Sequence, residues 1–250
     1  MIIRYHRDAT SEAINIQQIL RKYGITVDLE TGSISYFTKN HPKILCKSLY
    51  FLRHADTVGT LEHRFMSDDS VNGALVPEGK YKLLISANEI DDIYPDIILY
   101  SDIPRVKETA EVLRSFLTNA IPFKKLLWMK GINNEGWENM QPSELFGIDR
   151  QDYVQREIVH NIFAKSEGGT SWGTVMVNAT QLLEYLNGQC QGKCVLVISQ
   201  GSLMYALKMV LRLEEIPWRN YSSQEFYNLV STGQNLYGKV QKIKVETVNS

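Results

Sequence analysis

Residues 48–57 read Ser-Leu-Tyr-Phe-Leu-Arg-His-Ala-Asp-Thr, and this stretch decides the fold. The apolar run from Leu49 to Leu52 predicts a buried strand, because a short continuous apolar run is typical of a strand covered on both faces. Arg53 and His54 follow directly at the end of this run. In an open parallel sheet, ligands bind beyond the carboxyl ends of the strands. The order of residues therefore places a cation and an imidazole where a ligand would bind.

This pair of side chains suits phosphate chemistry. A neutral imidazole such as that of His54 can attack phosphorus, and the planar guanidinium of Arg53 can hold the phosphoryl oxygens while it does so. A strand followed by an ordinary basic turn would look the same over these residues. The rest of the chain has to decide between the two interpretations.

The remainder of the chain alternates predicted strands with predicted helices, which is typical of a parallel sheet built from βαβ units. Strands are expected at 46–53, 96–101, 124–129, 193–199 and 235–248. Helices are expected at 78–90, 104–117, 151–164, 172–188 and 202–212. We therefore predict an α/β fold, a three-layer sandwich with a mostly parallel central sheet flanked by helices.

Residues 1–47 precede this alternation and predict a small appendage. The segment 11–23 has the apolar spacing of an amphipathic helix. The segments 25–30 and 33–37 alternate with period two around a short Thr-Gly turn, which predicts a β-hairpin. We predict a helix and hairpin appendage over 1–47 and one larger domain over 48–250. The sequence leaves open whether the appendage covers the ligand site, extends the central sheet or makes a dimer contact.

Composition excludes several classes of protein. The chain has 250 residues, of which 44% are hydrophobic and 22% charged, and this suits one soluble α/β domain. A net charge of -1 favours neither nucleic acid nor a membrane surface. No run is long enough to span a membrane, and the first residues lack the apolar stretch of a signal peptide. Three cysteines fit a reducing compartment, so we expect a cytoplasmic protein.

Several segments, in the right order, resemble the histidine phosphatase superfamily, the phosphoglycerate-mutase-like proteins. Residues 52–57 are similar to its signature of an apolar strand, Arg-His-Gly or Arg-His-Ala, and a following Thr. Residues 75–79 resemble its Leu-Thr-x-x-Gly helix opening, and residues 101–110 resemble its Ser-x-x-x-Arg-x-x-x-Thr-Ala segment. Residues 195–201 resemble the strand that ends in its second catalytic histidine. The likeness covers residues 48–240.

The resemblance implies phosphoryl transfer through a phosphohistidine, with no metal and no organic cofactor. His54 would be the nucleophile, and Arg53 and Arg105 would neutralise the charge of the phosphoryl oxygens. Arg105 falls in the first turn of a predicted helix, where backbone amides also favour an anion. Three hydroxyl side chains are candidates for binding the substrate: Thr57, Thr60 and Ser101.

Two positions depart from the superfamily pattern. Gln200 stands where the second catalytic histidine is expected. Its amide can still donate a hydrogen bond to a phosphoryl oxygen, so it remains a catalytic candidate, but it carries no positive charge. Gly131 stands where the usual proton-donating glutamate is expected. Glu135 is the candidate that a shifted loop would bring to the substrate in its place.

Three functions remain open at this point. The first is a phosphatase that hydrolyses a small phosphomonoester or an activated phosphate through His54, and the retained arginines favour it. The second is a catalytically impaired member, a pseudoenzyme, that binds a phosphorylated ligand or protein partner. The third is a fold reused for protein interaction through residues 1–47. We expect a phosphorylated small molecule as the ligand, with no nucleic acid or membrane partner, and a homodimer stays open.

Overall fold

The central sheet has five strands in the spatial order β5-β4-β6-β3-β7. The structure, a computed structural model, describes residues 10–37, 42–141, 144, 162–163, 165–212 and 237–243. The strands are β3 (Ser48–Arg53), β4 (Ile97–Tyr100), β5 (Phe123–Lys125), β6 (Cys194–Ser199) and β7 (Val240–Ile243). The first four run parallel, while β7 pairs with β3 in the antiparallel sense at one edge. The predicted mostly parallel sheet is confirmed.

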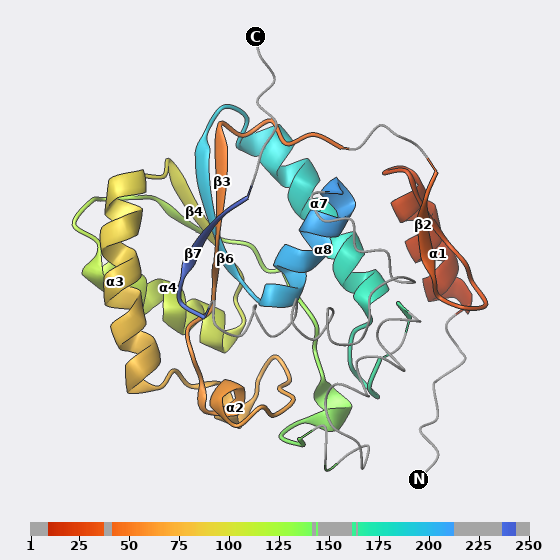
Figure 1. The fold of residues 1–250 in the computed structure, drawn as a ribbon, viewed down its shortest axis with the longest axis horizontal. Coiled ribbons are helices and arrows are strands. Elements are labelled where there is room, and N and C mark those ends of the chain that lie inside the picture. Colours follow the sequence, from red (N-terminus) through yellow and green to blue (C-terminus); the bar gives the residue numbers. More distant parts are fainter. Residues whose placement is uncertain are drawn as a thin grey trace.

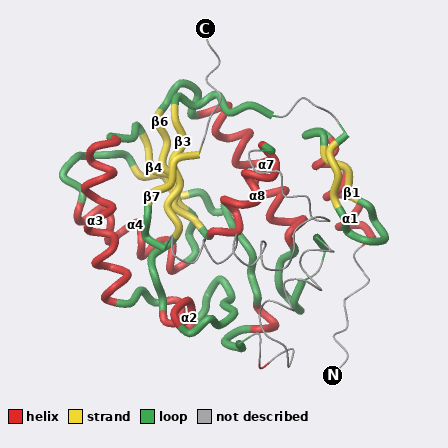
Figure 2. The backbone as a smooth tube through the Cα atoms, viewed as in Figure 1, coloured by secondary structure: helices red, strands yellow, loops and turns green. Residues whose placement is uncertain are grey.

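Helices cover both faces of this sheet (Figure 1). One face carries α3 (Pro77–Ile93) and α4 (Pro104–Phe116), and the other carries α7 (Trp172–Gln189) and α8 (Gly201–Leu211). Figure 2 shows the strands as a thin layer between these two pairs of helices. Each face has its own cluster of buried apolar side chains. The arrangement is the predicted three-layer sandwich.

The apolar run in β3 reflects burial on both faces of the sheet. Leu49 and Phe51 belong to the cluster beneath α7 and α8, and Leu52 belongs to the cluster beneath α3 and α4. Successive side chains of a strand point to opposite faces. A strand covered on both faces therefore needs apolar residues without interruption. Residues 195–198 of β6 divide between the two clusters in the same alternating way.

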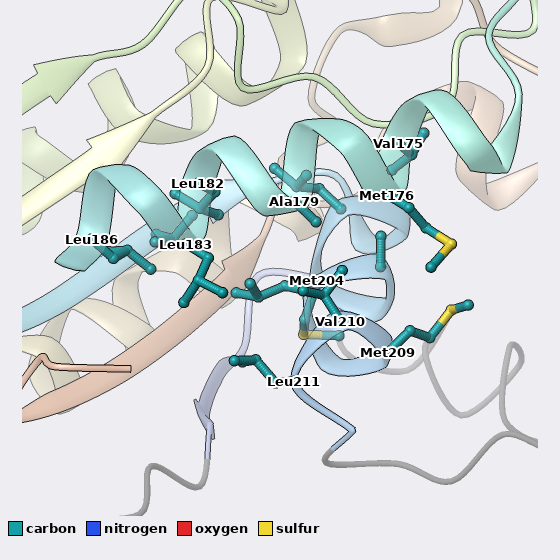
Figure 3. Close-up of a cluster of buried hydrophobic side chains, with 14 of the residues drawn as sticks. Val175, Met176, Ala179, Leu182, Leu183, Leu186, Met204, Met209, Val210 and Leu211 are labelled. Carbon is teal, nitrogen blue, oxygen red and sulfur yellow. The ribbon is translucent and has the colours of Figure 1, made fainter. Parts of the chain in front are cut away.

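The larger cluster packs α7 and α8 on the sheet, and Figure 3 draws the part of it around these two helices. α7 contributes side chains at three- and four-residue spacing, among them Val175, Ala179 and Leu186. α8 contributes Met204 and Val210 to the same cluster. This spacing forms the apolar stripe of a helix that packs on a core. The packing of α7 against α8 in this cluster fixes the start of α8, which follows β6, over the sheet.

The starts of the helices follow local sequence signals. The Ser171 side chain accepts a hydrogen bond from the Thr174 amide and caps α7. Pro77 and Pro104 are the first residues of α3 and α4, where the missing N–H of proline removes no helical hydrogen bond. Arg105 consequently lies in the first turn of α4, as the sequence predicts. Three short helical turns complete the described part: α2 (Val58–Leu61), η1 (Val71–Gly73) and η2 (Glu135–Trp137).

The prediction of a strand at 124–129 is wrong about its extent, because β5 covers only Phe123–Lys125. Its partner β4 ends at Tyr100, and the Leu126 amide donates to the Tyr100 carbonyl at 2.8 Å as the last link between them. Beyond that point no strand of the described residues continues the ladder, so the chain turns away. The strand predicted at 235–248 appears as β7 at Val240–Ile243. The helix predicted at 151–164 falls almost entirely outside the described residues.

The N-terminal appendage consists of α1 (Thr10–Arg21) and an antiparallel hairpin of β1 (Ile25–Val27) and β2 (Ile34–Tyr36). The two strands form a sheet of their own, so within the described residues the appendage does not extend the central sheet. It lies beside α7 and α8, on the side away from the sheet (Figure 1). The predicted helix and hairpin are confirmed.

Apolar and polar contacts anchor the appendage to the helical layer. Its buried side chains Ile16, Leu20 and Ile25 belong to the same cluster as the stripe of α7. The Tyr36 hydroxyl donates to the Met209 carbonyl at 3.0 Å. The hairpin therefore shares a core with the larger unit, and the division of the chain at residue 47 stays a prediction.

Candidate active site

The parallel strands bring the predicted residues to one edge of the sheet. β3 and β6 pair with Arg53 opposite Ser199, and β4 and β6 pair with Tyr100 opposite Ile198. The residues that follow these strands therefore emerge together, at the lower end of the sheet in Figure 1, where α2 lies. His54 comes from β3, Ser101 from β4 and Gln200 from β6.

His54 is buried and lies at the centre of this group. Its ring is held by a 2.9 Å hydrogen bond between Nδ1 and the Ala55 carbonyl, and its backbone N–H donates to the Ser199 carbonyl at 3.0 Å. Since a carbonyl only accepts, Nδ1 carries the proton and Nε2 keeps a free lone pair. Burial, and next the positive charges of Arg105 and Arg53, hold the pKa of His54 well below its ordinary value of 6.5. The imidazole is consequently neutral and nucleophilic at neutral pH.

This depressed pKa predicts that acid destabilises the protein through His54. In the unfolded chain His54 takes up a proton near pH 6.5, whereas the folded chain takes it up only at lower pH. Because the unfolded state then binds more protons, stability is lost as pH falls below 6.5, by at most about 1.4 kcal/mol per pH unit. Urea denaturation between about pH 7.5 and pH 5 should show a shallower loss for His54→Asn than for the wild type.

The exposed His63 provides a matched control for that measurement. Its backbone is left-handed (φ 55°), a conformation that asparagine tolerates, so the exchange should not strain the fold. The variant His63→Asn should therefore keep the acid-side slope of the wild type. Equal slopes for the wild type and His54→Asn would show that His54 is not held neutral by the fold.

Arg105 is a buried cation with unsatisfied hydrogen-bonding capacity. One guanidinium nitrogen donates to the carbonyls of Ser67 and Asp68 at 2.9 and 3.2 Å. Its Nε is buried without a hydrogen-bond partner among the described residues. Burial lowers the pKa of Arg105, opposed by the negative charge of Asp68, but arginine stays charged in proteins. A desolvated guanidinium of this kind is a strong receptor for an anion.

Arg53 is held by an aromatic residue that the sequence motifs do not identify. Its guanidinium lies 3.6 Å from the centroid of the Tyr237 ring and donates to the Tyr237 hydroxyl. The same ring lies 5.4 Å from the His54 ring, centroid to centroid. On its other side Arg53 approaches Gly201, where a Cβ atom would stand 3.1 Å from the arginine Nε. Tyr237 thus contacts both the nucleophile candidate and its neighbouring cation.

Gln200 is bound to the segment that contains Gly131. Its Oε1 accepts from the Gly131 amide at 2.6 Å, and its Nε2 donates to the Ile132 carbonyl at 3.2 Å. Next to it, the Ser202 hydroxyl accepts from the Ile132 amide at 2.9 Å. A Cβ atom at Gly131 would lie 2.3 Å from the Ser202 Oγ and 2.5 Å from the Gln200 Oε1. Gln200 and Gly131, the two departures from the superfamily pattern, therefore pack against each other, and only glycine fits at position 131.

The other predicted binding residues have structural contacts of their own. Thr57 and Thr60 bond to one another and cap α2, with the Thr57 hydroxyl accepting from the Thr60 amide at 3.2 Å. Ser101 is fully buried, and its hydroxyl has no hydrogen-bond partner among the described residues. The Glu135 carboxylate lies beside Gly168, and the Asn133 Nδ2 is 3.5 Å from the Glu135 Oε2. The binding roles of these four residues stay predictions.

Two carboxylates beside Arg105 complete the surroundings. Glu138 accepts hydrogen bonds from the Ser67 amide and the Ser70 hydroxyl. Burial alone would raise the pKa of Glu138, but these hydrogen bonds and the charge of Arg105 outweigh it and lower the pKa. Asp68 pairs with Lys130 at 3.3 Å. These contacts tie the loop after α2 to both sides of Gly131, at Lys130 and at Glu138.

Comparison with known proteins identifies the family. Residues 49–242 match the family model of the histidine phosphatase superfamily (branch 1). The chain belongs to the histidine phosphatase superfamily. No curated protein sequence matches it, so its place in the superfamily rests on this family model.

The solved structures that resemble this member of the superfamily are distant in sequence. Bacillus stearothermophilus YhfR superposes with a TM-score of 0.58 at 20% identity, covering 70% of this chain and 85% of its own. Phosphoserine phosphatase from Entamoeba histolytica gives 0.55 at 22%, and a mycobacterial glucosyl-3-phosphoglycerate phosphatase complexed with VO3 gives 0.54 at 16%. Each of these two also covers 70% of this chain and 85% of its own. At such identities the likeness shows the shared fold.

The described residues contain no cluster of three or more His, Cys, Asp or Glu side chains that would hold a metal ion. Over the same part of the chain, no helix combines the length and the apolar character that crossing a membrane requires.

Proposed function

We propose that this protein hydrolyses a phosphorylated small molecule through a phosphohistidine formed on His54. The observation that carries the proposal is the buried, neutral imidazole with two arginines acting on it. A neutral ring is the nucleophilic form, and fixed positive charges lower the cost of the negative charge that gathers on the phosphoryl oxygens. Positioning and charge neutralisation supply most of the rate in phosphoryl transfer.

The reaction would take two steps. In the first, the Nε2 lone pair of His54 forms a bond to phosphorus while the bond to the leaving oxygen breaks, and that oxygen keeps the electron pair. In the second, a water oxygen bonds to phosphorus, the P–N bond breaks, and its electrons return to Nε2. The water protons pass to the released phosphate and to solvent. Arg53 and Arg105 would bind the phosphoryl oxygens in both steps.

Trapping the intermediate tests this proposal. The protein is mixed with radiolabelled acetyl phosphate or an aryl phosphate, quenched in alkali and digested, and the labelled peptide is mapped. We expect an acid-labile label on His54, together with release of inorganic phosphate. The absence of both with every donor would reject the phosphohistidine route.

A second candidate function is the binding of a phosphorylated ligand without turnover. It is favoured by one observation, the use of both ends of the Gln200 amide by the backbone of Gly131 and Ile132. Under this alternative, vanadate or phosphate raises the melting temperature, since a ligand of the folded state stabilises it, while no donor releases phosphate.

The contact between Tyr237 and Arg53 leads to a further prediction. Tyr237→Phe keeps the ring over the guanidinium but removes its hydroxyl acceptor. Because a hydrogen bond to a charged group contributes about 1.5–3 kcal/mol, we expect kcat/KM to fall about tenfold or more. The change should appear in steady-state phosphate release, and the loss of the same bond from the resting protein should also lower the melting temperature.

Tyr185→Phe is the matched control, because Tyr185 lies on α7 near Trp128, away from Arg53. It should leave kcat/KM as in the wild type. If Tyr237→Phe behaves like this control, Tyr237 does not position Arg53 for the reaction.

A further inference from the structure

The charges around His54 restrict what the site can do to a leaving group. This inference rests on the proposed phosphohistidine route. The charged groups that act on the His54 ring are Arg105 and Arg53, and both are cations without a proton to give at neutral pH. Protonation of a departing oxygen therefore has to come from some other group.

The carboxylates near Arg105 do not fill this role. Glu138 accepts two hydrogen bonds through its carboxylate, and its pKa is lowered, so it is ionised at neutral pH. Asp68 pairs with the Lys130 ammonium at 3.3 Å, an interaction that only the carboxylate form makes. A carboxyl group held in its ionised form accepts a proton but has none to donate.

The neutral polar groups next to the site are also occupied. The Gln200 amide and the Ser202 hydroxyl are bonded to the backbone of Gly131 and Ile132. Gly131 itself has no side chain, and the contacts of 2.3 and 2.5 Å that a Cβ would make leave no room for one. Among the described residues these groups supply no protonated carboxyl group, and the Tyr237 hydroxyl beside His54 is hydrogen-bonded to Arg53.

A site whose described residues supply no carboxylic acid to the leaving group favours one that departs as a stable anion. We propose that the substrates are acyl phosphates, the mixed anhydrides of a carboxylic acid and phosphoric acid. His54 Nε2 bonds to phosphorus, the P–O bond to the acyl group breaks, and the carboxylate leaves with the electron pair and without a proton. A carboxylate has a conjugate-acid pKa of about 4, against about 10 for a phenolate, so only the former leaves readily unprotonated.

The same surroundings disfavour a diphosphate, the other common activated donor. Its departing phosphate carries further negative charge, which would need additional cations. Arg53 and Arg105 would already bind the phosphoryl group that is transferred, and Lys130 is paired with Asp68. The Asp68 and Glu138 carboxylates would repel the added charge. A departing carboxylate brings only a single charge.

A leaving-group series tests the substrate class with the wild-type protein. Phosphate release is measured for acetyl phosphate, for pyrophosphate, and for phenyl phosphates whose ring substituents span a range of phenol acidity. All donors transfer the same phosphoryl group, and the rate left in His54→Ala is subtracted. We expect kcat/KM to be highest for acetyl phosphate. Across the phenyl series it should fall about 10²–10⁴-fold towards the least acidic phenol, which is the contribution of a positioned general acid.

The outcomes separate this inference from the proposed function. A phenyl series that is flat, yet lost in His54→Ala, would show that a proton donor is present and overturn the inference while the phosphohistidine route stands. Pyrophosphate cleaved faster than acetyl phosphate would overturn the acyl assignment alone. No release and no label on His54 from any donor would reject the proposed function, and the inference with it.

Discussion

Replacing His54 by alanine should abolish phosphate release and the labelled intermediate, with a loss of at least about 10³-fold in kcat. The reason is chemical, because alanine has no nitrogen with which to form the bond to phosphorus in the first step. Folding should survive the change: the backbone N–H of His54 keeps its bond to Ser199, and among the described residues the lost side chain made one hydrogen bond, to Ala55. Phosphate release and alkaline trapping of the phosphoenzyme measure the effect.

A vanadate-binding measurement distinguishes the loss of the nucleophile from the loss of the anion-binding site. Arg53 and Arg105 remain in His54→Ala, so vanadate should still raise its melting temperature, though less than in the wild type. His63→Asn is the matched control, since it changes an exposed histidine, and its turnover should equal that of the wild type. Turnover that persists in His54→Ala would mean that the histidine is not the nucleophile.

The sequence predicts the sheet and the position of the nucleophile for the same physical reason. Leu49 to Leu52 form an unbroken apolar run, which only a strand buried on both faces requires. Parallel strands end at the same edge, so the residues after β3, β4 and β6 had to emerge together. These are local patterns combined with one rule of topology, and they place Arg53 and His54 without any knowledge of loops.

Contacts between distant segments were beyond the reach of such patterns. Tyr237 contacts Arg53, which lies 184 positions earlier in the sequence, because β7 pairs antiparallel with β3 just after Tyr237. No sequence pattern around Tyr237 predicts this contact. The residue type of Gln200 predicts that its amide donates to phosphate. In the structure both of its ends bond to the loop at 131–132, whose path depends on tertiary packing. The short extent of β5 likewise follows from where its neighbour stops.

Gly131→Ala should destabilise the protein by about 2–4 kcal/mol, although it adds a single methyl group. The new Cβ would lie 2.3 Å from the Ser202 Oγ and 2.8 Å from the Gln200 Cβ, both too close for real contacts. Relief requires the loop at 131–132 to move from the start of α8, which breaks the hydrogen bonds that Gln200 and Ser202 make with it. Urea denaturation of the wild type and variant gives the difference.

The control is a second glycine-to-alanine change at a position with free space. Gly188 is exposed near the end of α7, and a Cβ there meets nothing within 4 Å. Since alanine favours a helix over glycine, Gly188→Ala should stabilise the protein by up to about 1 kcal/mol. The opposite signs of the two variants would establish that Gly131 is required for packing. If Gly131→Ala were as stable as the wild type, the site would have room for a side chain there, and the missing proton donor would lose its structural explanation.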